Sequence, residues 1–192
     1  MRSNKAFTLN RTIYLVIFVI GSWQFGSGMY IYAKSHYAQF LMENAWSKTI
    51  NGQGYVKPWS WADTHPIAKI SFLEHKKNYI VLAGGSGRTM AFGPGHISAT
   101  SMPGKHGNSV LVGHRDTHFS ILKELEIGNV IDIQNSDSLV RYEVVNSFIV
   151  DRSQTEVMND YGIKLLTLIT CYPFDDLHAG GPLRYVVQAV AI

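Results

Sequence analysis

The stretch Lys164–Arg184, KLLTLITCYPFDDLHAGGPLR, decides the fold of the C-terminal part of this chain. Its first half, up to Cys171, is apolar and rich in β-branched residues, which is typical of a mostly buried strand. Pro173 ends this strand, because proline has no N–H to give to a sheet and restricts the residue before it. A glycine-containing loop follows, and Leu183–Ile192 is predicted to form the next strand. Cys171, the sole cysteine, therefore ends one strand, and Arg184 begins the next.

A lone cysteine usually packs as a small buried apolar residue, and that is the first interpretation of Cys171. A histidine upstream favours a catalytic interpretation of Cys171 instead. The apolar strand Val110–Val112 ends at Gly113-His114. A histidine at one strand end can act as an acid or a base toward a thiol at another strand end. His114, Cys171 and Arg184 are therefore candidates for one catalytic cleft.

Several phrases of the sequence support that interpretation together. TLITC ends at Cys171, GHRDTHF contains His114, and an arginine follows the cysteine by thirteen positions. This combination resembles the sortases, the membrane-anchored cysteine transpeptidases of bacterial cell envelopes, over roughly the last two thirds of the chain. His114 and Arg184 match the family's other two catalytic positions in order and approximate spacing. The phrases PWSWADTHP, AFGPGH and YPFDDLHAGGPLRYVV look like the Gram-negative branch of the family.

The resemblance implies a role for each of these residues. The Cys171 thiolate attacks a backbone carbonyl of a protein substrate and forms a thioester. His114 protonates the departing amine and then deprotonates the incoming nucleophile. Arg184 places a cation where the carbonyl oxygen becomes negative. Thr170, next to the nucleophile, shapes the substrate pocket, although an ordinary strand threonine is an equal alternative.

The resemblance also implies the partners. The substrate is a secreted protein with a C-terminal sorting signal, a short Pro-x-Thr-Gly-like motif before a hydrophobic tail, and the acceptor is an amine at the cell envelope. We expect no cofactor and no metal. Two rival functions stay open: a thiol peptidase of the hydrolase class that uses water as the acceptor, and a non-catalytic β-domain that binds peptide.

The hydrophobic pattern predicts an all-β catalytic part. Short strands separated by glycine-rich turns, with little helix, are typical of a closed β-barrel, and the sortase resemblance implies about eight strands. Turns are predicted at Gly84–Arg88 and Gly93–His96, and one or two helical turns at Phe119–Leu125. The predicted strands are Ile67–Leu73, Tyr79–Ala83, Val110–His114, Val130–Ile133, Val140–Val150, Leu165–Cys171 and Leu183–Ile192.

The N-terminal part predicts a membrane anchor. Ile13–Ala33 is uncharged over about 21 residues, enough to cross a bilayer. The cations before it place the N-terminus in the cytoplasm, so the catalytic domain lies on the periplasmic side of the bacterial inner membrane. A cleaved signal peptide is the alternative, but no small-x-small cleavage site follows a short apolar core. We therefore divide the chain into a cytoplasmic segment (1–12), a transmembrane signal anchor (13–33), a juxtamembrane helix and linker (34–60) and a sortase catalytic domain (61–192).

The charges after the anchor exclude one class of partner. The chain has 17 Lys and Arg and 14 Asp and Glu, and three of the cations, Arg2, Lys5 and Arg11, precede the anchor. The remaining cations and anions balance, whereas nucleic-acid binding needs a basic face.

A zinc site is a further alternative, because His114 and His118 lie four residues apart. Such a pair needs a helix, whereas the preceding residues predict a strand, and the glutamate of an HExxH motif is missing. His118 is better explained as a polar or packing residue.

Overall fold

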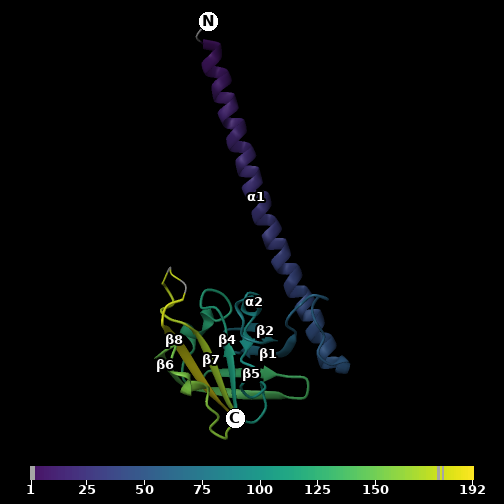
Figure 1. Ribbon diagram of the computed structural model, residues 1–192, viewed down its shortest axis with the longest axis vertical. Helices are drawn as coiled ribbons and strands as arrows, with labels where there is room; N and C mark the ends of the chain where they lie inside the picture. Colours follow the sequence, from purple (N-terminus) through teal and green to yellow (C-terminus); the bar gives the residue numbers. More distant parts are fainter. Residues whose placement is uncertain (1–2, 177, 179) are drawn as a thin grey trace. The chain divides into compact units, whose positions relative to one another are not determined.

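The computed structural model describes residues 3–176, 178 and 180–192 (Figure 1). The chain divides into two compact units, Met1–Phe40 and Leu41–Ile192. The helix α1 (Ser3–Lys48) runs through the boundary between them.

The second unit contains a closed β-barrel, as the sequence predicted (Figure 1). In the described part of the chain its strands follow the order β1-β2-β3-β4-β7-β8-β6-β5, and β5 pairs back with β1. Two pairs are parallel, β2 with β3 and β4 with β7, and the other pairs are antiparallel. The strands are β1 (Pro66–Phe72), β2 (Lys77–Ala83), β3 (Gly95–His96), β4 (Asn108–Val112), β5 (Val130–Gln134), β6 (Leu139–Asp151), β7 (Leu165–Cys171) and β8 (Leu183–Ala191).

Short helices connect some of the strands. They are η1 (Thr49–Gln53), α2 (Gly87–Met90), η2 (Ser120–Glu124) and η3 (Thr155–Met158). The turn predicted at Gly84–Arg88 is only partly right, because the Ser86 hydroxyl accepts a hydrogen bond from the Thr89 backbone N–H and starts the helical turn α2. The predicted turn Gly93–His96 is wrong at its end, where β3 bridges β2 and β4.

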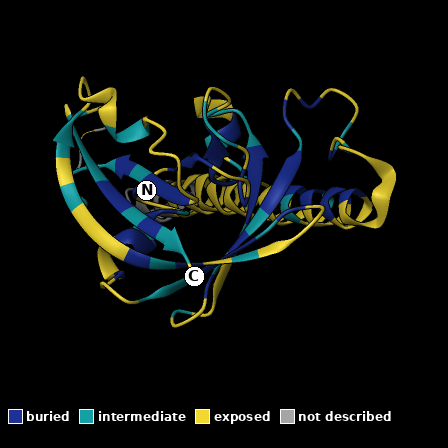
Figure 2. Ribbon diagram, turned by 90° about the horizontal axis from the view of Figure 1, so that it is seen from below, coloured by how far each residue is buried: buried dark blue, intermediate teal, exposed yellow. Residues whose placement is uncertain are grey.

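The barrel encloses the main hydrophobic core. The core residues of a strand are alternate ones, such as Ile131 and Ile133 of β5, as expected of a pleated strand. In β4 and β7, however, four successive residues are buried, and buried positions lie along the barrel strands in Figure 2. The largest fully buried side chains in this core include Phe72, Ile70, Leu111, Phe119, Tyr142, Leu166 and Leu168.

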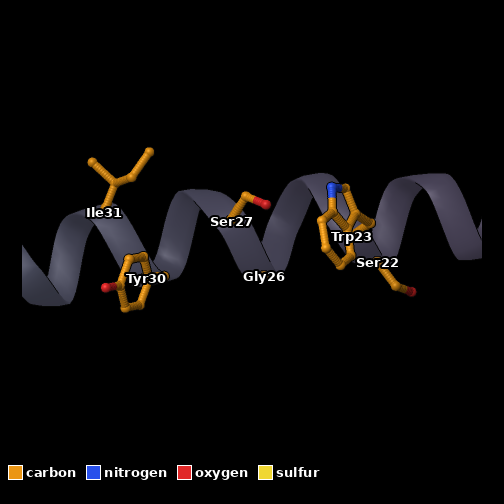
Figure 3. Close-up of a pocket in the computed structure, with 6 residues that line it drawn as sticks. All are labelled: Ser22, Trp23, Gly26, Ser27, Tyr30 and Ile31. Carbon is orange, nitrogen blue, oxygen red and sulfur yellow. The ribbon is translucent and has the colours of Figure 1, made fainter.

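The first unit is the N-terminal stretch of α1. Its large apolar side chains are exposed from Ile13 to Phe40, and the helix is long and apolar enough to cross a membrane by length and composition. Figure 3 shows a shallow hollow on this helix that is lined by Ser22, Trp23, Gly26, Ser27, Tyr30 and Ile31. Exposed apolar side chains of this kind are expected on a membrane-spanning helix, because lipid rather than water surrounds them there.

The C-terminal stretch of α1 belongs to the second unit and packs on the barrel. Met42 and Trp46 are buried in a small core with Ile80 and Leu82 of β2. Trp59 packs against this core and contacts Phe92 edge to face, with ring centroids 5.2 Å apart. Within residues 34–60, for which a juxtamembrane helix and a linker were predicted, α1 ends at Lys48 and η1 follows it.

Candidate active site

Cys171 and Arg184 lie side by side at the end of the β7–β8 ladder. They are directly paired residues of these antiparallel strands, and the backbone N–H of Tyr172 donates to the Leu183 carbonyl at 3.1 Å just beyond them. Directly opposed side chains share one face of a sheet, with Cβ atoms about 5 Å apart. Both residues are half-buried, so each side chain is accessible to a ligand.

The strand β4 brings His114 to the same edge of the barrel. β4 runs parallel to β7 with Val112 opposite Ile169, and the Gly113 N–H donates to the Ile169 carbonyl at 3.2 Å. Two residues further along each chain are His114 and Cys171, so the two reach the same level of the sheet. The His114 side chain is exposed. The structure therefore brings the three predicted catalytic residues to one edge through backbone pairing.

Thr170 is tied to the segment that carries the histidine. Its side chain is 2% exposed, and its hydroxyl donates to the Gly113 carbonyl at 2.7 Å. Gly113 itself packs against Phe119, where a Cβ would come within 2.8 Å of the ring. The hydroxyl of Thr170 thus holds the residue before His114, and the role in a substrate pocket stays a prediction.

The Arg184 guanidinium is oriented by its own loop. Nη1 donates to the carbonyls of Gly181 and Leu183, at 2.7 and 2.8 Å. Within residues 3–176, 178 and 180–192, no acceptor engages Nε or Nη2. These donors are suited to an oxygen of a bound ligand.

Two buried polar residues that the sequence analysis did not single out support loops at opposite ends of the β4–β7 pair, Arg115 at the Cys171 end and Asn108 at the Leu165 end. Arg115 is 5% exposed and donates to three backbone carbonyls of the loop between β7 and β8. Asn108, 1% exposed, donates to the carbonyls of Val157 and Asn159 in the loop before β7. The GHRDTHF phrase includes Arg115, but only the fold shows what it binds.

His118 lies near the site as a packing residue. Its ring contacts Tyr79 edge to face, with centroids 5.3 Å apart. Burial lowers the pKa of His118, and the nearby His114 lowers it further, because two imidazolium charges repel. Within the part of the chain that the structure describes, no three His, Cys, Asp or Glu side chains gather as a metal site needs.

Comparison with known proteins identifies the family to which this fold belongs. The family model Sortase domain matches residues 70–192. Sortase D of Bacillus subtilis is 36% identical over 96 residues, which is 50% of this chain and 48% of that protein. The match thus spans about half the length of this relative. Similar solved structures include a Clostridium perfringens Sortase D5 transpeptidase (TM-score 0.67, 23% identity, 82% of this chain and 99% of that one).

Two further structures show the same fold. One is sortase C-1 from Actinomyces oris (TM-score 0.59, 28% identity, 66% of this chain and 74% of that one). The other is Sortase A from Corynebacterium diphtheriae (TM-score 0.61, 25% identity, 69% and 63%). The Gram-negative branch that the sequence phrases indicate stays a prediction. The family model covers more than half of the chain and includes the strands that hold Cys171, His114 and Arg184, and on that ground the chain belongs to the sortase family.

Proposed function

We propose that this protein is a membrane-anchored cysteine transpeptidase with Cys171 as the nucleophile, His114 as the acid and base, and Arg184 as the oxyanion partner. The direct pairing of Cys171 with Arg184 carries the proposal, because it sets a thiol and a cation on one face of the sheet. His114 reaches the same edge through β4.

The reaction has two steps. The Cys171 thiolate attacks the carbonyl carbon of a sorting signal, the C–N bond breaks, and the departing amine takes a proton from His114. The substrate then stays on Cys171 as a thioester. An incoming amine attacks this thioester, loses a proton to His114 and releases the thiolate. In both steps the carbonyl oxygen becomes negative, and the free donors of Arg184 stabilise it.

The partners follow from this reaction and from α1. The substrate is a secreted protein with a C-terminal sorting signal, and the acceptor is an amine of the cell envelope. The apolar helix anchors the protein in the inner membrane with the barrel on the periplasmic side. Added protease should therefore degrade the barrel in spheroplasts, and protection of the barrel would contradict this orientation.

A thiol peptidase is the second candidate, because the same thioester can be attacked by water. The deciding experiment incubates the full chain in detergent with a model sorting peptide, with and without an added amine, and follows the products by mass spectrometry. We expect the peptide–amine product to dominate when the amine is present. Hydrolysis alone at every amine concentration would favour the peptidase. No cleavage by the wild type, matching a Cys171→Ala control, would favour a peptide-binding domain.

A further inference from the structure

Arg115 is a buried cation. Among the described residues, its hydrogen-bond acceptors are backbone carbonyls of the loop that follows Cys171. Its side chain is 4% exposed, and burying a charge is costly unless its donors are satisfied. Arginine offers five donors in a rigid fork, which lets it bind several oxygens at once. The hydrogen bonds of the guanidinium therefore have to offset the cost of burying its charge.

The fork of Arg115 spans the loop between β7 and β8. Nη1 donates to the Pro173 carbonyl at 2.7 Å, and Nη2 donates to the carbonyls of Asp176 and His178, at 2.5 and 2.8 Å. Nε lies 3.4 Å from a carboxylate oxygen of Asp116. One side chain therefore binds backbone oxygens along the first half of the loop.

This loop joins two of the proposed catalytic residues. It begins after Cys171, where β7 ends, and leads to Arg184 at the start of β8. The Asp176 carboxylate braces the same part of the loop by accepting the His178 N–H at 2.9 Å. That bond, together with nearby Arg115, lowers the pKa of Asp176. The Arg115 guanidinium with its three bound carbonyls, called the clamp below, thus acts on a loop segment that the Asp176–His178 hydrogen bond also orders.

Arg115 also follows His114 directly in the chain. Its backbone belongs to the turn in which the N–H groups of Thr117 and Phe119 donate to the His114 carbonyl. The segment that carries the histidine and the loop that follows the cysteine are therefore joined by one guanidinium.

We propose that Arg115 is a positioning residue that fixes the β7–β8 loop as a wall of the peptide-binding cleft, and so sets the affinity for the sorting peptide. The inference rests on the proposed function and names a residue that touches neither the substrate nor the reacting atoms. Loss of the clamp should weaken peptide binding more than the chemical step, because the β7–β8 ladder still pairs Cys171 with Arg184.

The test compares Arg115→Met, Arg115→Lys and the wild type as full chains in detergent. Methionine keeps much of the side chain's volume without a donor, whereas lysine keeps the charge but not the fork. The matched control is Arg141→Met. Arg141 donates through Nε to Asp132 at 2.8 Å, in the β5–β6 pair, and its side chain is 52% exposed.

We expect Arg115→Met to raise KM for the sorting peptide by about tenfold or more, with kcat lowered less than about threefold. Arg115→Lys should lie between it and the wild type, and Arg141→Met should leave KM unchanged. Alkylation of Cys171 by a small reagent should stay within about twofold of the wild-type rate, since it needs no peptide cleft. Amide hydrogen exchange should speed up in residues 172–182 in both Arg115 variants.

Three outcomes would overturn the inference. Unchanged KM in a variant with a lowered Tm would show that Arg115 only stabilises the fold. A loss in kcat with unchanged KM would place its effect on His114 instead. If Arg115→Met does not fold, the KM and kcat of Arg115→Lys are compared with those of the wild type in the same way. If the wild type cleaves no peptide, the proposed function is wrong, but hydrogen exchange still tests the role of Arg115. Amide exchange in residues 172–182 that is equally fast in Arg115→Lys and the wild type would then refute that role.

Discussion

Cys171 and Arg184 are paired residues in the register of β7 and β8, and this pairing places their side chains on one face of the sheet. The backbone ladder sets their spacing, so the arrangement is present before a substrate arrives. Arg184 adds rigidity through Nη1, which is bound to two carbonyls of its own loop. Preorganised donors of this kind are the most effective way to stabilise a developing oxyanion.

Replacing Arg184 with lysine should therefore damage catalysis selectively. Lysine keeps the charge but loses the planar fork, so we expect kcat/KM to fall by about a hundredfold or more, the usual loss for one oxyanion donor. The two backbone bonds of Nη1 are also lost, which should lower the free energy of unfolding by about 1 kcal/mol. Steady-state kinetics and thermal melts measure the two effects. Transpeptidation near the wild-type rate would exclude Arg184 as the oxyanion partner.

Replacing Cys171 with alanine should abolish peptide cleavage and leave the fold intact. The side chain is half-buried at a strand end, so removal of its sulfur should cost about 1 kcal/mol or less. Mass spectrometry should show a thioester with the sorting peptide in the wild type and none in the variant. Cleavage by the variant would mean that another group is the nucleophile.

The local pattern of residues predicted much of this barrel. β7 has the predicted bounds, Leu165–Cys171, because a β-branched run and a following proline define both of its ends within the segment itself. β8 and β5 also match to within one residue. The pattern of short strands and glycine-rich turns also predicted a closed barrel, and the family resemblance supplied the number of about eight strands. The order of the strands could not be read locally.

Features that depend on distant partners escaped prediction. β3 has two residues, and Gly95 fits there because a Cβ would lie 2.3 Å from the Gly84 carbonyl of the neighbouring segment. Arg115 binds carbonyls that lie 58 to 63 residues further along the chain. The sequence did not show which residues of the long helix pack on the barrel: Met42 and Trp46 are buried against Ile80 and Leu82 of β2, whereas Tyr37 and Phe40 are exposed.

Truncation should show where the catalytic domain begins. Met42 and Trp46 bury Ile80 and Leu82, so a protein that starts at residue 41 should be more stable than one that starts at residue 61. Loss of two large buried side chains costs several kcal/mol, about 3 kcal/mol or more in sum. Thermal melts of the two proteins, with Met42→Ala in the longer one, measure the difference. Equal stability would support a domain that begins at residue 61.

Acid should destabilise the barrel through His96. This residue is 3% exposed, its Nε2 lies 2.9 Å from the Ser101 carbonyl, and burial lowers its pKa despite that bond. The unfolded chain then binds the proton more tightly, so the free energy of unfolding should fall as the pH drops below the unfolded pKa of about 6.5. His96→Gln should show a shallower fall between pH 7 and 5 in urea melts. A slope equal to that of the wild type would assign the effect to other groups.

Thr170 offers a test of how firmly His114 is held. Its buried hydroxyl donates to the Gly113 carbonyl, one residue before the histidine. Thr170→Val keeps the shape of the side chain but leaves that carbonyl without its bond, which should cost about 1–3 kcal/mol of stability. The proton transfer proposed for His114 needs its ring placed within about 0.5 Å, so kcat should fall by about tenfold or more.

Thr170→Ser is the matched control for this variant, because it keeps the hydroxyl and loses only a methyl group. It should retain most of the wild-type kcat, whereas the valine variant should not. If Thr170→Ser loses activity and Thr170→Val does not, the methyl group rather than the hydroxyl of Thr170 is what matters, and contact with the substrate becomes its better explanation. If neither loses activity, the ladder between β4 and β7 is sufficient to place His114 by itself.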